Sequence, residues 1–275
     1  MTHSKEILIL VNCYNNEKEV ICFANHLSMQ SFHSKILLAV TCNSTHDKKK
    51  MEDGLQKTKI AVIICDPNKN LGYLHGCLFG YRQAIAFDHF KWIMIANTDI
   101  TFQSPAFFEK LLSHKFMDDI WCIAPRIVLP SGKEQNPFLM QRPTVKKMHL
   151  WKMIESKPKC LQFYTFLSKI KNRLQTNRTK PQKSKLIYAP HGSCFLLKPD
   201  CIEILNKTYA DLFMYGEEIF VAEIILKNQK KVFYEHSLLV HHHENATTKH
   251  INYQQKARFY ERSFRYLINT FFKDE

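Results

Sequence analysis

Glycine is scarce in this sequence, and two glycine-based binding motifs are absent from it. Only seven of the 275 residues are glycine, and they form neither the G-x-G-x-x-G pattern of dinucleotide-binding turns nor a P-loop with its Lys-Ser/Thr ending. The chain also lacks a run of the roughly 18 apolar residues that a membrane-spanning helix needs. No signal-peptide pattern precedes the strand-like residues 7–11. We therefore expect a cytoplasmic protein.

Cysteine is present but follows no pairing pattern. The nine cysteines are odd in number and scattered, they contain no Cys-x-x-Cys pair, and several lie inside apolar runs. Such residues are typical of buried free thiols. Cys and His residues also do not converge at the spacings of a zinc site. The sequence therefore favours reduced cysteines without a structural role in metal binding.

Acidic residues are few for the number of basic ones. Asp and Glu number 25 against 39 Lys and Arg, which gives a net charge of +14 and a pI near 9.3. This balance indicates an anionic partner, such as a nucleic acid, an acidic membrane surface or a phosphorylated substrate. The imbalance is partly regional, because residues 146–185 are crowded with Lys and Arg and contain one acid, Glu155. Charge alone does not choose among these partners.

Short runs of apolar residues alternate with helix-like patterns through the first half of the chain. This order is typical of βαβ units and predicts an α/β fold with a mostly parallel central sheet. The expected strands span 7–11, 35–40, 60–65 and 92–96, and the expected helices span 17–28, 48–56, 76–87 and 105–114. Ligands bind beyond the carboxyl ends of such strands. The polar residues that follow these strands are 12–16, 41–47, 66–72 and 97–99.

Residues 130–185 interrupt this rhythm with prolines, aromatic residues and a basic helical stretch over 149–174. We interpret them as an insertion in one domain, between a first half (1–129) and a second half (186–252), with a terminal helix in 253–275. The elements expected after the insertion are a strand running into 191–193, a strand at 194–197, helices at 200–205 and 217–228, a strand at 232–242 and a basic aromatic helix at 253–272.

Asp99 follows the hydrophobic strand 92–96, after Asn97 and Thr98. A carboxylate in this place can hold the divalent ion of a diphosphate, because Mg²⁺ or Mn²⁺ is satisfied by one protein carboxylate together with phosphate oxygens and water. An Asp at a strand end is also an ordinary turn or helix-capping residue. Taken alone, Asp99 therefore leaves both interpretations open.

Glu217 and Glu218 are adjacent acids at the start of an expected helix, directly after Gly216. One of these carboxylates could take the proton of an acceptor hydroxyl. Acids in the first turn of a helix also complement the helix dipole without any catalytic role. This pair, too, has a functional and a structural interpretation.

Three histidines, 241–243, end the expected strand 232–242. Strand alternation places Val240 and His242 on one face, and His241 and His243 on the other. Histidines at a strand end suit a metal or phosphate contact, although a single histidine is usually structural.

The segment 70–80 follows the third strand, and its glycines, beginning with Gly72, permit a close approach of a diphosphate to a helix N-terminus.

Together and in this order, these segments resemble the inverting family 2 glycosyltransferases with the GT-A fold, especially the rhamnosyltransferase-like branch of bacterial polysaccharide biosynthesis. The resemblance covers nearly the whole chain. The matching segments are 11–17, 70–73, 97–99, 192–195, 217–218 and 240–242.

The resemblance implies a glycosyltransferase that moves a sugar from a UDP- or dTDP-linked donor to a hydroxyl of a saccharide. It implies that Glu218 is the general base, supported by Glu217, and that Asp99 and His242 contact Mg²⁺ or Mn²⁺. The hydroxyl would attack the anomeric carbon with inversion, while the metal stabilises the departing diphosphate. The nucleotide-sugar site implied in this way contains Val11, Asn12, Tyr14, Asn43, Asn70, Gly72, Asn97, Asp99 and Gly192.

Two positions depart from the family pattern. Asn97 replaces the first acid of the Asp-x-Asp motif, so that metal binding relies more on Asp99 and His242. The acid expected after the second strand, which would read the base, is replaced by Cys42 and Asn43. The base of the donor is therefore left open.

The basic insertion and the aromatic tail fit an enzyme that works peripherally on an anionic membrane, at the inner face of the plasma membrane. Its acceptor would be a saccharide or a lipid-linked saccharide, as in capsular, O-antigen or other cell-surface polysaccharide synthesis. A solvated cationic face is the alternative interpretation of the basic insertion and the tail.

Because no nucleic-acid motif is recognisable, we expect no nucleic-acid partner. The rival functions are a catalytically inactive GT-A-fold binding protein and a basic nucleic-acid-binding protein.

Overall fold

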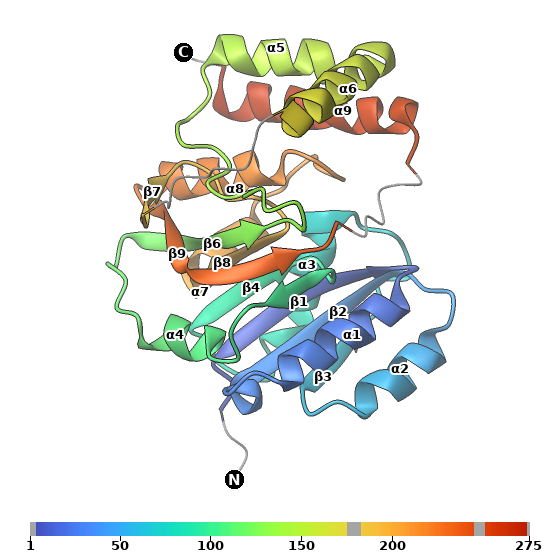
Figure 1. The fold of residues 1–275 in the computed structure, drawn as a ribbon, viewed down its shortest axis with the longest axis vertical. Coiled ribbons are helices and arrows are strands. Elements are labelled where there is room, and N and C mark those ends of the chain that lie inside the picture. Colours follow the sequence, from blue (N-terminus) through green and yellow to red (C-terminus); the bar gives the residue numbers. More distant parts are fainter. Residues whose placement is uncertain (1–3, 175–182, 245–250, 274–275) are drawn as a thin grey trace.

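The computed structural model of the chain describes residues 4–174, 183–244 and 251–273. Its centre is a sheet with helices on both faces, and a further group of helices lies beyond one of these faces (Figure 1). Along the sheet the strand order is β3-β2-β1-β4-β8-β6-β9-β5, and β7 pairs with β9. The expectation of an α/β fold built on a central sheet is confirmed.

The first half of the chain forms the parallel part of the sheet. Strands β1, β2 and β4 consist of apolar runs that are buried on both faces, which suits the interior of a parallel sheet. The expected bounds of α1, α2 and β4 are confirmed, whereas α3 begins earlier than expected, at Tyr73. The elements are β1 (Ile7–Tyr14), α1 (Glu17–Ser28), η1 (His33–Lys35), β2 (Ile36–Ser44), α2 (Lys48–Gln56), β3 (Ala61–Cys65), α3 (Tyr73–Ala84) and β4 (Trp92–Ala96).

The second half adds strands of mixed direction. β8 runs antiparallel between β4 and β6, β6 pairs in parallel with β9, and the short β5 lies antiparallel to the end of β9. Neither β5 nor β6 was expected from the sequence. The elements are β5 (Ile100–Phe102), α4 (Phe107–Ser113), β6 (Ile120–Val128), β7 (Lys185–Ile187), β8 (Cys194–Leu197), α7 (Pro199–Lys207), α8 (Glu217–Lys227) and β9 (Lys231–His242).

The strand expected to run into 191–193 is wrong in its extent. β7 ends at Ile187, and Ala189 makes only an isolated bridge with Leu139. Pro190 follows, and a proline has no backbone N–H to donate to a ladder. Residues 191–193 therefore form a loop that leads into β8.

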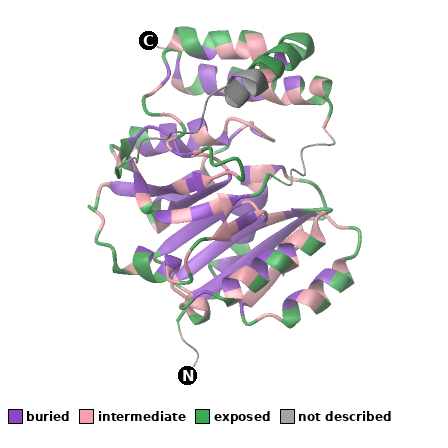
Figure 2. Ribbon diagram, viewed as in Figure 1, coloured by how far each residue is buried: buried purple, intermediate pink, exposed green. Residues whose placement is uncertain are grey.

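Two hydrophobic cores cover the two faces of the sheet. Alternate residues of β1 enter different cores, Leu8 and Leu10 on one side and Ile7 and Ile9 on the other. Helices α3, α7 and α8 cover the first face, and α1, α2 and α4 cover the second. The strands are buried along most of their length (Figure 2). All nine cysteines are free, and seven of them are buried in agreement with the expectation, whereas Cys22 and Cys160 are exposed.

A layer of helices, here called the helical cap, lies beyond α8 (Figure 1). It consists of α5 (Val145–Glu155), α6 (Pro158–Leu174) and α9 (Tyr253–Phe271), which contact one another. The basic helical stretch expected over 149–174 is helical but divided into two helices, because the first ends at Glu155 and the second begins at Pro158. Proline cannot continue a helix interior but suits the first helical position. Within the described ranges, no helix is both long and apolar enough to span a bilayer.

Candidate active site

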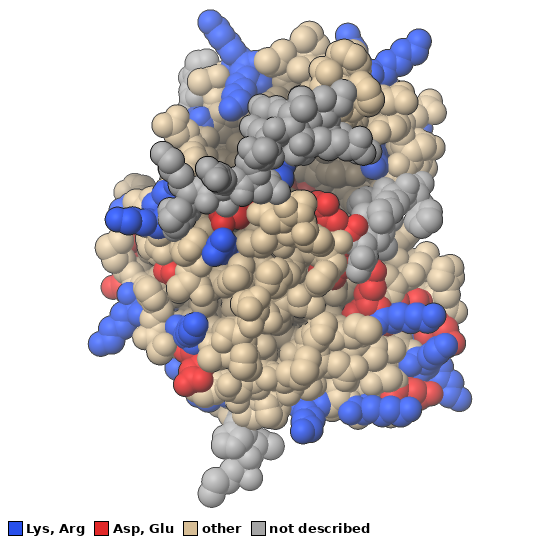
Figure 3. All heavy atoms as spheres, viewed as in Figure 1, with Lys and Arg blue, Asp and Glu red and all other residues tan. Residues whose placement is uncertain are grey.

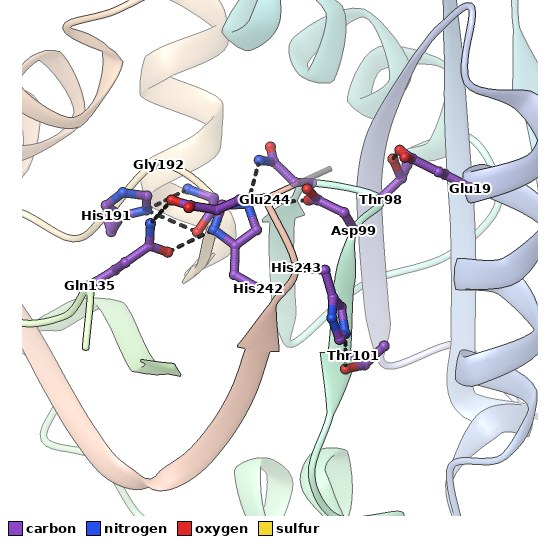
Figure 4. Close-up of polar contacts among 12 residues, drawn as sticks. Glu19, Thr98, Asp99, Thr101, Gln135, His191, Gly192, His242, His243 and Glu244 are labelled. Atoms are coloured by element: carbon purple, nitrogen blue, oxygen red, sulfur yellow. Dashed lines mark hydrogen bonds and ion pairs between the residues drawn. The ribbon is translucent and has the colours of Figure 1, made fainter. Parts of the chain in front are cut away.

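Asp99 and His242 come together where β4, β5 and β9 meet. Asp99 lies in the turn between β4 and β5, and the antiparallel pairing of β5 with β9 sets Ile100 opposite His242. The backbone N–H of His243 donates to the carbonyl of Asp99 at 3.0 Å. The two side chains point toward each other (Figure 4), and Asp99 Oδ1 lies 3.2 Å from His242 Nε2. Each side chain is only 8% exposed.

Two neighbours of His242 favour a proton on Nδ1 of its ring, whereas the Asp99 carboxylate beside Nε2 suits this tautomer only when an ion lies between the two side chains. Gln135 Oε1, which can only accept, lies 2.7 Å from Nδ1, and the amide nitrogen of Asn97 lies 3.4 Å from Nε2. A neutral imidazole protonated on Nδ1 satisfies both contacts. Its Nε2 lone pair then faces Asp99, which is the arrangement of a metal-binding histidine oriented by a second hydrogen bond.

The spacing of Asp99 and His242 fits a divalent ion of the Mg²⁺ or Mn²⁺ type. Two ligands that lie about 2.1 Å from one ion at a right angle are separated by about 3 Å, close to the 3.2 Å observed here. The described residues contain no group of three or more His, Cys, Asp or Glu that could hold a metal. The pair therefore suits an ion that takes its remaining ligands from phosphate oxygens and water, rather than a closed zinc site.

The other two histidines of the strand end point elsewhere, as the alternation predicted. His243 Nε2 lies 2.9 Å from the hydroxyl of Thr101, and His241 Nε2 lies 2.5 Å from Gln103 Oε1. His242 is buried, whereas His243 is exposed. The predicted preference for His242 over its neighbours is therefore consistent with the geometry.

Residues 191–193, here called the bridging segment, connect the Asp99–His242 pair to the second cluster of acids. The His191 ring lies 6.2 Å from that of His242, centroid to centroid, and the Ser193 carbonyl accepts from the N–H of Asn97 at 2.8 Å. His191 Nδ1 accepts from the Ser193 N–H at 3.2 Å. Burial, reinforced by His242 and Lys133, lowers the pKa of His191 to about 3, which keeps this ring neutral.

Glu217 and Glu218 begin α8 on the other side of the bridging segment. Gly216 precedes them with a left-handed φ of +87°. Burial raises the pKa of both carboxyl groups, and the neighbouring Glu218 raises that of Glu217 further. Glu217 is 5% exposed, and its Oε1 has no hydrogen-bond partner among the described residues. Glu217 is buried and Glu218 half-buried, and two adjacent carboxylates in such a place resist double ionisation.

The side chain of Glu218 approaches Gly192 closely. The backbone N–H of Gly192 favours the ionised form of the Glu218 carboxyl, and a Cβ at position 192 would lie 2.6 Å from Glu218 Oε1. The carbonyl of Gly192 accepts from the Tyr73 hydroxyl at 2.7 Å. Gly192 thus lets the bridging segment contact the catalytic candidate directly.

The turn at Gly72, in the segment predicted to bind the nucleotide sugar, packs against the loop that precedes α8. Gly72 has a φ of +80°, and a Cβ there would lie 2.0 Å from the Phe213 carbonyl, which also accepts from the Tyr73 N–H at 3.0 Å. The Asn70 side chain accepts from the Gly72 N–H at 2.9 Å. Only glycine fits this combination of φ and contact.

Asn43 holds the same turn with its whole amide group. Its Nδ2 donates to the Gly72 carbonyl at 2.9 Å and its Oδ1 accepts from the Leu71 N–H at 3.0 Å. Asn43 is buried in β2 rather than placed in a loop. Its side chain therefore positions the turn, and a direct contact with a base stays a prediction.

The remaining predicted donor residues lie along the end of β1. Asn12 donates to the Tyr73 carbonyl at 2.8 Å, while its Oδ1 is buried without a partner among the described residues. Val11 is fully buried, and Tyr14 is 44% exposed at the strand end. Gln135, His191 and Tyr73 also border the site, although none was predicted as a site residue.

The comparisons with known proteins support a fold but no sequence family. No protein-family model and no curated protein matches the sequence. The structure is similar to the mannosyltransferase PcManGT from Pyrobaculum calidifontis, solved with GDP-Man and Mn²⁺. The TM-score is 0.55 and the identity 11%, over 90% of this chain and 59% of that one.

Two further solved structures are similar. GalNAc-T7, solved with UDP, GalNAc and Mn²⁺, gives a TM-score of 0.59 at 12% identity, over 90% of this chain and 45% of that one. TarS from S. aureus gives 0.52 at 11% identity, over 84% and 60%. This chain spans less than two thirds of each. The expected GT-A-type fold is therefore confirmed, whereas the rhamnosyltransferase-like branch stays a prediction.

Proposed function

We propose that this protein is an inverting glycosyltransferase that moves a sugar from a nucleoside-diphosphate sugar to a hydroxyl of a saccharide acceptor. The observation that carries the proposal is the pair Asp99–His242, joined by the bridging segment to Glu217 and Glu218. A metal-competent pair and a buried carboxylate pair thus meet at the carboxyl end of β4. This is where α/β sheets bind ligands.

The donor side would hold the diphosphate of the nucleotide sugar. Asp99 Oδ1 and His242 Nε2 would hold Mg²⁺ or Mn²⁺, which neutralises the charge that develops on the departing diphosphate. Two structural neighbours were solved with a nucleotide and Mn²⁺, GDP-Man in one and UDP in the other. The two bases differ, and the sequence leaves the donor of this chain open between UDP and dTDP.

The acceptor side would remove a proton from the attacking hydroxyl. Glu218 takes the proton while the hydroxyl oxygen forms a bond to the anomeric carbon. The bond from that carbon to the diphosphate breaks, and the nucleoside diphosphate leaves with the electron pair. Burial keeps the pKa of Glu218 raised, which makes it a stronger base than an exposed carboxylate. Glu217 would hold the shared proton and leave Glu218 ionised.

Ligand-dependent thermal stability tests this donor site. We expect GDP, UDP or dTDP at 100 times its Kd to stabilise the fold by about 2.7 kcal/mol, a rise in Tm of roughly 5–10 °C for a chain of this size. The rise should require Mn²⁺ or Mg²⁺ and be removed by a chelator. If none of the three nucleotides raises Tm with either ion, the donor site is wrong.

The helical cap suggests where the enzyme works. Several large apolar side chains on α5 and α6 are exposed, namely Leu150, Met153, Phe163, Phe166 and Leu167. Exposed lysines lie on the same two helices or beside them, namely Lys146, Lys147, Lys157 and Lys159. Lys and Arg side chains project from this end of the molecule (Figure 3). Apolar and basic side chains together suit an anionic bilayer surface.

We therefore infer that the cap docks on an anionic membrane, at the cytoplasmic face where anionic lipids concentrate. The acceptor would then be a lipid-linked saccharide of cell-surface polysaccharide synthesis. The support is the composition of the cap surface. The protein should sediment with phosphatidylglycerol–phosphatidylcholine vesicles more than with pure phosphatidylcholine vesicles.

A pair of phenylalanine substitutions tests this docking. Phe163→Ser with Phe166→Ser should weaken binding to the anionic vesicles roughly 30–1,000-fold, because each exposed ring contributes about 1–2 kcal/mol on entering the bilayer boundary and the two together about 2–4 kcal/mol. Phe87→Ser is the matched control, since Phe87 is 64% exposed, close to the 63% of Phe163, but lies after α3. Equal loss in both variants, or no binding by the unchanged protein at physiological salt, would contradict membrane docking.

A further inference from the structure

Glu155 occupies an unfavourable place for a carboxylate. It is the last residue of α5, where the partial negative charge of the helix end repels an anion. It is half-buried, and the described residues give it no hydrogen bond or ion pair. It is also the single acid among residues 146–185. This placement lowers the stability of the fold, and no contact within the described residues compensates for it.

Glu155 lies one helical turn after Trp151 on α5, and α5 packs on α9, where Trp151 contacts Phe264 and Phe264 in turn contacts Tyr260. Burial, and then the charge of Glu218, raises the pKa of Glu155 to about 7. The Tyr260 hydroxyl of α9 lies within the electrostatic reach of Glu155, Glu217 and Glu218. The packing of α5 on α9 and the stacking of Tyr260 on Tyr215 thus bring the end of α5 and α9 to the loop that precedes α8. Acidic side chains gather below the cap on the face shown in Figure 3.

An aromatic pair stands beside these acids. The rings of Tyr215 and Tyr260 stack with centroids 4.2 Å apart and planes inclined by 14°. Both side chains are half-buried, so that part of each ring remains accessible. Tyr215 has a φ of +69°, a strained value for a bulky residue.

Helix α9 holds this strained loop in place. The Ser263 hydroxyl donates to the Met214 carbonyl at 3.2 Å, and Leu267 packs so closely on Gly216 that an added Cβ would lie 3.0 Å from it. The aromatic pair is thus a rigid surface rather than a loop tip. Rigid aromatic faces beside a few polar groups are typical of small-molecule sites.

The buried acceptor atom of Glu217 points to a ligand at the same place. Glu217 Oε1 lacks a hydrogen-bond partner within the described part of the chain, and the residue is 5% exposed. Tyr215 of the aromatic pair lies two residues before Glu217 in the chain. A buried polar atom without a partner costs free energy that a donor on a bound molecule would recover. Sugar hydroxyls are such donors.

We propose that Glu155, Tyr215 and Tyr260 form the acceptor subsite and select an uncharged sugar ring over an acidic one. This inference rests on the proposed function. One face of the ring would stack on the tyrosine pair, and its hydroxyls would donate to the carboxylate of Glu155 and to the unpartnered carboxyl oxygen of Glu217. An acceptor sugar that carries a carboxylate or a phosphate would meet three acids. Glu155 is thus a specificity residue contributed by the insertion.

Glu155→Gln separates the charge of this side chain from its shape. The wild-type protein should use neutral methyl hexopyranosides at least tenfold better, in kcat/KM, than the matching methyl hexuronides. Glu155→Gln should reduce this preference about tenfold by raising kcat/KM for the hexuronides, because it removes one repelling charge. Asp53→Asn, an exposed acid on α2, is the matched control and should keep the wild-type preference.

Thermal stability gives a second measurement on the same variant. Glu155→Gln should raise Tm at pH 8, because the variant no longer has to ionise a half-buried group at a helix end. An unchanged preference between neutral and acidic acceptors would overturn the subsite. The subsite would also be overturned if the protein hydrolysed the donor but no neutral glycoside increased the rate of donor turnover. Absence of nucleotide binding and of any turnover in the wild-type protein would instead overturn the proposed function, and the subsite with it.

Discussion

Glu218→Gln is expected to lower the rate of sugar transfer by about 10²–10⁴-fold, the usual contribution of a general base. Glutamine keeps the size of the side chain and its place beside Gly192 but cannot accept a proton. Donor binding should persist, because the Asp99–His242 pair lies on the other side of the bridging segment. Single-turnover transfer rates, with nucleotide-dependent Tm as the binding measurement, check both parts.

Glu217→Gln is the matched control for this prediction. In the proposed mechanism Glu217 holds the shared proton, and glutamine imitates that neutral form, so most of the transfer rate should remain. The raised pKa of Glu217 gives stability that is present below its ordinary value of 4.5 and lost as pH rises through the raised pKa. Tm of Glu217→Gln should therefore fall less than that of the wild type on going to alkaline pH. A transfer rate of Glu218→Gln within about threefold of wild type would assign the base elsewhere.

The sequence predicted the parallel half of the fold well because its signals are local. The apolar run of β4 and the periodic apolar pattern of α1 each contain enough apolar residues to specify the type of the element and where it begins and ends. β5 has three residues and is fixed only by its pairing with β9. β6 lies in the middle of the sheet but was not recognised between α4 and the insertion. Short or isolated strands depend on partners that are distant in sequence.

The site was predicted in part for the same reason. Asp99 and His242 stood out because each ends a strand, and β-sheet pairing brings strand ends together. Gln135, His191 and Glu155 were not predicted as site residues, because each lies in a loop or at a helix end whose position depends on tertiary packing. Asn43 shows the converse case. Its sequence position suggested a nucleotide contact, yet both ends of its amide bind the Gly72 turn.

Asp99→Asn is expected to reduce metal-dependent transfer by about 10³-fold, because a bound ion supplies several kcal/mol of transition-state stabilisation. Asp99 is the one carboxylate of the pair, and its neighbour Asn97 carries no charge. The loss should appear both in the transfer rate and in the Mn²⁺ concentration needed for nucleotide-dependent stabilisation. Titration of Mn²⁺ at saturating nucleotide, followed by Tm, measures the second effect.

Asn97→Asp provides the opposite change at the same place. The Asn97 amide lies 3.4 Å from His242 Nε2, beside the proposed metal position, so a carboxylate there would add a second anionic oxygen for the ion. We expect Mn²⁺ to bind about tenfold more tightly in this variant, since each added charge contributes roughly 1–2 kcal/mol at a partly buried site. Without a bound ion, the new carboxylate would only repel Asp99 and lower Tm. Tighter Mn²⁺ binding in Asn97→Asp and weaker binding in Asp99→Asn would together assign the ion to this pair, whereas equal Mn²⁺ dependence in both variants would place it elsewhere.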